Sequence, residues 1–289
     1  MTASARSYPL ARERTLILGT LLVLAAVAWA IIIWQAGAVQ DGHMSMSAAP
    51  MRAEEQMGIG QEMAAAAEMA AEPGFMGLTM NMSALLYIGL WAAMMVAIMF
   101  PTAAPMILTF ARVQATRRER GQTFVSTWLF TGSYIALWSA TGLIAYAVAV
   151  GGDALAERSA WIMDNAARAG GGLLLLAGVY QLTPLKSMCL SKCRTPMSFI
   201  LGSWRDGKAG AVRMGVEHGT YCLGCCWMLF VILFPLGMMN VAAMAVITGV
   251  IFAEKSFVLG RKIAQLAAFA LIVYGAVVIA IPGALPTMI

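Results

Sequence analysis

The sequence predicts an all-α, polytopic membrane protein of about seven transmembrane helices, with the N-terminus in the cytoplasm and the C-terminus outside. Composition is the first reason: 61% of the 289 residues are hydrophobic and only 11% are charged. Soluble domains carry about 25% charged residues. The second reason is that apolar runs of about 20 residues, long enough to cross a bilayer as helices, recur along the chain.

The orientation follows from the basic residues. They cluster in four short segments, residues 6–14, 112–120, 186–213 and 255–262. Because cytoplasmic loops of membrane proteins are enriched in Lys and Arg, all four clusters are expected on the cytoplasmic side. We expect the lipid bilayer to surround most of the protein.

The seven expected spans are residues 15–34, 83–111, 123–150, 169–183, 214–236, 241–253 and 263–281. The first apolar run is longer than the apolar region of a signal peptide, which has about 7–15 residues, so we expect it to be a retained anchor. The chain then divides into an N-terminal anchor helix (1–34), a Met-rich extracytoplasmic segment (35–82) and a six-helix membrane domain that holds a Cys/His cluster (83–289).

The densest group of potential ligands lies in residues 217–227. This stretch contains His218, Cys222, Cys225 and Cys226. On a helix of about 3.6 residues per turn, the three cysteines lie at about 40°, −20° and 80° relative to the histidine. The four side chains therefore share one stripe about 100° wide, while Trp227 points away from it.

A second cysteine pair lies just before this span. Cys189 and Cys193 have a four-residue spacing and lie on the cytoplasmic side, so the two groups can converge. A single buried cysteine is usually a small core residue. Clustered polar residues in a membrane span are costly unless they pair with one another or bind a ligand. This cost favours a ligand or redox role for the group. Thiolate and imidazole suit copper(I), and zinc is the alternative.

Methionines offer a further set of soft ligands. Met94, Met95 and Met99 fall near the middle of the second expected span, where thioethers would extend a metal path, although core filling is the simpler interpretation. In the Met-rich segment, His43, Met44 and Met46 either capture a soft metal ion outside the membrane or merely contact its surface.

The sequence argues against nucleotide binding and nucleic-acid binding. Residues 202–208 have the spacing of a phosphate-binding loop, but Ala209 replaces the required Ser or Thr and no strand precedes the motif, so nucleotide binding is not expected. The basic clusters are explained by topology rather than by nucleic-acid binding. Glu254 and Lys255, adjacent at the end of a span, are expected to pair with each other or to reach the interface.

Several stretches of the sequence resemble motifs of a known bacterial family. They are Met94-Met95 through Pro101, residues 180–186, Cys189 through Arg194, residues 218–227, residues 237–240 and Glu254-Lys255. The family comprises predicted metal-binding integral membrane proteins, a domain of unknown function sometimes labelled copper chaperone. The resemblance begins at about the second span and excludes the Met-rich segment. The sequence departs from the family at Ala243, where the resemblance implies an aromatic residue. This is a packing position, so the departure does not affect the metal-binding interpretation.

The sequence therefore favours an inner-membrane protein that binds copper(I) through Cys, His and Met side chains, for copper delivery, transfer or uptake. A copper-donating or copper-accepting protein would be its partner. Two alternatives stay open. One is a membrane thiol–disulfide oxidoreductase that uses the Cys222/Cys225 and Cys189/Cys193 pairs, so that enzymatic activity is undecided. The other is an assembly factor with a structural zinc site.

Overall fold

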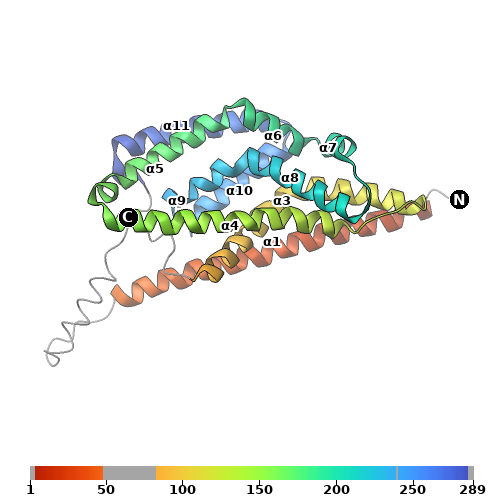
Figure 1. The fold of residues 1–289 in the computed structure, drawn as a ribbon, viewed down its shortest axis with the longest axis horizontal. Coiled ribbons are helices and arrows are strands. Elements are labelled where there is room, and N and C mark those ends of the chain that lie inside the picture. The colour runs from red at the N-terminus through yellow and green to blue at the C-terminus, as the bar shows by residue number, and fades with distance from the viewer. Residues whose placement is uncertain (1–3, 48–82, 239, 286–289) are drawn as a thin grey trace, which may run out of the picture.

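A computed structural model describes residues 4–47, 83–238 and 240–285 of the chain. In these ranges every regular element is helical, and the long helices lie alongside one another in a bundle (Figure 1). The elements are α1 (Ser4–Ser47), α3 (Ala84–Glu119), α4 (Thr127–Arg158), α5 (Ala160–Gln181), α6 (Pro184–Arg194), α7 (Pro196–Ser203), α8 (Gly207–Val231), α9 (Leu233–Leu236), α10 (Val241–Ser256), α11 (Gly260–Ala280) and the 3₁₀ helix η1 (Pro282–Ala284).

The predicted all-α class is confirmed for these residues, whereas the number of spans is only partly supported. Five segments are long and apolar enough to cross a membrane: Arg12–Gly37, Ala84–Glu119, Thr127–Arg158, Gly207–Leu236 and Gly260–Ala280. A sixth is possible if α5 and α6, which meet at a 63° bend, count as one broken span. The remaining expected span corresponds to α10, whose 16 residues reach only about 24 Å, less than the hydrocarbon thickness.

Two polar stretches that were expected to be loops are largely helical. Residues 151–168 form the end of α4 and the start of α5, separated by Ser159 alone. Much of the basic stretch 186–213 lies in α6, α7 and the first turns of α8. Local capping explains one of these starts: Pro184 occupies the first turn of α6, and the Thr183 hydroxyl accepts a hydrogen bond from the Lys186 amide at 3.3 Å.

Contacts bring the basic clusters together in pairs. Arg118 forms a salt bridge with Glu13 of α1, and Arg117 bonds to Asp206, the residue before α8, at 2.7 Å. Arg194, at the end of α6, donates to the carbonyl of Phe257, after α10, at 2.8 Å. This arrangement is compatible with the predicted common side for all four clusters.

Glycines allow the helices α5 and α11 to approach closely. A Cβ atom on Gly178 of α5 would lie 2.7 Å from the carbonyl oxygen of Ala268 on α11. A Cβ on Gly171, two turns earlier, would lie 2.9 Å from the carbonyl of Gly275. The pair α5–α11 lies along one side of the bundle (Figure 1), and α8 packs instead against α4 and α6.

Candidate metal centre

Helix α8 presents the predicted ligand stripe to the interior. His218, Cys222, Cys225 and Cys226 are all at most 2% exposed, whereas Trp227 is 41% exposed. The thiols of Cys225 and Cys226 each contact the carbonyl oxygen of Cys222, at 3.1 and 2.8 Å. The single stripe expected from the helical period is therefore confirmed as a buried face.

Three thiols from two helices form a compact group, which we call the three-thiol group: Cys193 of α6 with Cys222 and Cys225 of α8. Their sulfur atoms all lie within 4.8 Å of one another, and the Sγ atoms of Cys193 and Cys225 are 3.9 Å apart. The bend between α5 and α6 turns α6 across α8, which brings the distant Cys193 to this face. One member of the second cysteine pair therefore converges with the first group, as expected.

The other cysteines lie around this group. Cys189 is half-buried against α8, where its Sγ would lie 2.7 Å from a Cβ placed on Gly224. Neither Cys189 nor Cys226 belongs to the three-thiol group. Gly224 is thus needed for close packing of Cys189 on α8, and the role of the outer cysteines as ligands remains a prediction.

A thioether completes the soft surroundings of Cys222. Met99 of α3 is fully buried, and its Sδ lies 3.9 Å from the Cys222 Sγ. Met95, one turn earlier, is also fully buried. Met94 instead lines a small cavity between α3 and α10. Of the three methionines singled out in the sequence, Met99 alone has a described contact with a thiol of the group.

Cys222 also receives polar contacts that the sequence did not reveal. The Lys255 ammonium of α10 lies 3.0 Å from the Cys222 Sγ and 3.5 Å from the Thr102 hydroxyl. The Tyr134 hydroxyl of α4 lies 3.1 Å from the same sulfur. A cation and a hydroxyl beside one thiol stabilise the thiolate, which is the form of cysteine that binds metals.

Glu254 does not pair with Lys255 and is buried, so neither arrangement expected for it from the sequence is found. Glu254 bonds instead to the ammonium of Lys186 at 2.7 Å and to the amide of Gln181 at 3.2 Å. Glu254 and Lys186 are at most 2% exposed. Adjacent residues of a helix point about 100° apart, so one can face α5 and α6 while the other faces the thiols. Because Glu254 pairs with Lys186, the Lys255 ammonium contacts the Cys222 thiol instead of a carboxylate.

His218 lies one turn before Cys222 among aromatic rings. Its ring centroid is 5.3 Å from that of Tyr134 and 5.4 Å from that of Phe199. Its Nδ1 is buried and has no hydrogen-bond partner within the described ranges. The histidine is not a member of the three-thiol group, so its role as a ligand also remains a prediction.

The predicted collecting residues of the Met-rich segment are not placed in detail. The backbone of α1 continues through His43, Met44 and Met46, but their side chains lie outside the described part of the structure. Residues 48–82 lie outside it altogether.

In the described ranges the chain is all-helical, with five or six helices suited to a membrane and a buried group of three thiols placed to hold a metal ion. The chain belongs to the PpoB2 family, described as copper chaperone, whose model matches residues 88–278, well over half of the sequence. This confirms the resemblance found in the sequence motifs. No curated protein and no solved structure shows significant similarity to the chain.

Proposed function

We propose that this protein binds copper(I) in the inner membrane of a bacterium and transfers it to or from a partner protein. The observation that carries the proposal is the three-thiol group with the Met99 thioether beside Cys222. Thiolates and thioethers are soft ligands that prefer copper(I), whereas structural zinc sites take four Cys or His ligands. Copper(I) is the cargo of this site rather than a resident cofactor.

In this proposal the residues around the three-thiol group help copper(I) to enter and leave it. Cys226 and His218, on the buried face of α8, and Cys189, on α6, act as exchange ligands while copper enters or leaves. The Met-rich segment, including His43, Met44 and Met46, collects copper outside the membrane. Because thiolate binds copper(I) more tightly than thioether does, affinity increases toward the three-thiol group.

The proposal is tested with the purified full-length protein. Metal content is measured after growth with copper and zinc, and the copper(I) affinity is measured by competition with a chelator. Tight copper(I) binding that is lost on replacing the three thiols by serine supports the proposal. Stoichiometric zinc without copper would support the assembly-factor alternative instead.

Lys255 is expected to strengthen copper binding through its charge. Copper(I) with three thiolates has a net charge of −2, and burying that charge is costly. The nearby ammonium reduces the net charge to −1. We therefore expect Lys255→Met to weaken copper(I) binding by about 10- to 100-fold, as is usual for residues that support metal ligands.

Two variants control for this effect in the same competition assay. Lys255→Arg keeps the charge and should retain more affinity than Lys255→Met. Lys262→Met removes an exposed lysine of α11 and should leave the affinity unchanged. Equal affinities for Lys255→Met and Lys262→Met would show that the charge beside Cys222 is irrelevant to binding.

The oxidoreductase alternative has one observation in its favour, since the sulfur atoms of Cys193 and Cys225 are only 3.9 Å apart. An oxidoreductase would require these cysteines to cycle between thiol and disulfide. We expect thiol trapping in cells to find Cys193, Cys222 and Cys225 reduced under both oxidising and reducing growth conditions. A disulfide that forms and disappears with these conditions would favour the enzyme.

A further inference from the structure

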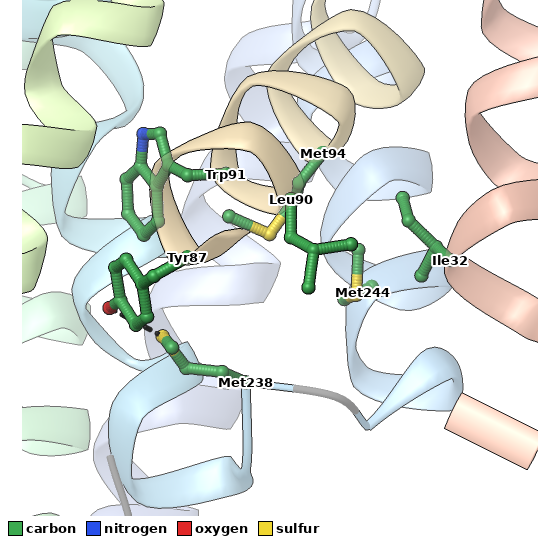
Figure 2. A pocket seen from close by; sticks show the side chains of 7 residues that line it. All are labelled: Ile32, Tyr87, Leu90, Trp91, Met94, Met238 and Met244. Atoms are coloured by element: carbon green, nitrogen blue, oxygen red, sulfur yellow. Dashed lines mark hydrogen bonds between the residues drawn. The ribbon is translucent and has the colours of Figure 1, made fainter. Parts of the chain in front are cut away.

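A second group of sulfur atoms surrounds a small cavity away from the three-thiol group. Figure 2 shows its walls: Met94 comes from α3, Met238 from the turn after α9, and Met244 from α10. Ile32, Tyr87, Leu90 and Trp91 complete the lining. The sequence does not predict Met238 and Met244 as ligands, because they lie far from Met94 along the chain.

We infer that this cavity is a second binding site for a soft monovalent cation, copper(I) or silver(I), held by the thioethers of Met94, Met238 and Met244. The cavity has a volume of about 30 Å³, enough for one water-sized occupant. Methionine is flexible, so the three sulfur atoms can close on an ion by changing side-chain rotamers.

The lining favours a soft cation of single charge. Its seven side chains include no carboxylate, imidazole or thiol, so a hard divalent ion would lose its hydration without gaining oxygen ligands. Tyr87 and Trp91 add aromatic rings, whose faces attract cations. The Tyr87 hydroxyl contacts the Met238 sulfur at 3.3 Å, which holds this thioether at the cavity wall (Figure 2).

The position of the cavity suits a capture site on the way to the thiols. Tyr87 lies in the first turn of α3, directly after the Met-rich segment, whose last methionines are Met80 and Met82. Met99, beside Cys222, lies about 7.5 Å farther along α3 than Met94, at 1.5 Å per residue. Met95 lies between them and is fully buried. This direction of transfer rests on the proposed function, whereas binding in the cavity does not.

The site is tested with silver(I), which binds soft ligands without redox chemistry. Full-length protein with ¹³C-labelled methionine methyl groups is prepared with all five cysteines replaced by serine, and the methyl signals are followed by NMR during silver(I) titration. We expect the signals of Met94, Met238 and Met244 to shift together. In the protein with intact cysteines, the Met99 signal should respond to the first equivalent and these three signals to a later one.

Substitutions then separate binding from packing. Met94→Leu conserves volume, so the fold should be retained. It should weaken the response of Met238 and Met244 to silver(I) by at least about tenfold, the loss of one soft ligand. Met188→Leu, at a position 63% exposed, should leave that response unchanged.

The outcomes distinguish this site from the three-thiol group. If the three methyl signals do not respond in the protein with intact cysteines, or if those of Met238 and Met244 respond equally in Met94→Leu, the cavity is only a packing defect and the inference is wrong. If they respond while the thiols bind no copper(I), the thioether site stands and the proposed function falls.

Discussion

Replacing Cys222 by serine is expected to reduce the copper(I) affinity of the purified protein by more than about 100-fold, beyond the usual effect of losing a supporting residue. Cys222 belongs to the three-thiol group and has the Met99 sulfur 3.9 Å away. It also receives the contacts of Lys255 and Tyr134, at 3.0 and 3.1 Å. Serine keeps the shape of the side chain but removes the soft ligand on which these contacts converge.

Cys189→Ser is the matched control for this experiment. Cys189 lies on the same helix as Cys193 but outside the three-thiol group, so its loss should change affinity by less than about tenfold. Both variants are compared by chelator competition at equal protein concentration. If Cys189→Ser is as damaging as Cys222→Ser, the copper lies between α6 and α8 at a different position from the one proposed.

The second large effect concerns stability. Lys186→Met is expected to lower the free energy of unfolding by about 3–5 kcal/mol, because it leaves Glu254 buried without its counter-charge. The Lys186–Glu254 bond is 2.7 Å long and both residues are at most 2% exposed. Because the pair joins α6 to α10, its loss should also loosen the elements that carry Cys193 and Lys255. Unfolding of the detergent-solubilised protein by denaturant measures the change.

A double substitution tests whether the uncompensated charge is the cause. Lys186→Met combined with Glu254→Gln removes both charges and should recover much of the lost stability. Lys192→Met, at an exposed position of the same helix, should have an effect within about 0.5 kcal/mol. A double variant as unstable as Lys186→Met alone would attribute the loss to packing rather than to charge.

The parts of the site that follow local geometry could be predicted from the sequence. The stripe from His218 to Cys226 depends only on the helical period, and the structure confirms it as buried. The convergence of Cys193 needed one further assumption, that α6 turns back against α8. Cys193 joins the three-thiol group and Cys189 does not, because of how α6 is rotated about its axis. The local sequence pattern does not predict this rotation.

Tertiary contacts account for what the sequence could not reveal. Lys255 pairs with a thiol rather than with Glu254 because Lys186, distant in sequence, takes the carboxylate. Met238 and Met244 join Met94 only because the turn after α9 and the start of α10 pack against α3. The polarity of residues 151–168 and 186–213 predicts loops between spans, but the helices continue through much of both stretches.

The most direct test of the central claim is X-ray absorption spectroscopy of the full-length protein loaded with one equivalent of copper(I). The proposed site predicts a copper(I) edge and a first shell of sulfur atoms alone, which is lost when Cys193, Cys222 and Cys225 are replaced by serine in a protein that also carries Met94→Leu, the change that weakens the thioether cavity. A first shell of nitrogen or oxygen ligands, or a sulfur shell that survives the triple replacement in the Met94→Leu protein, would contradict copper(I) binding by the three-thiol group.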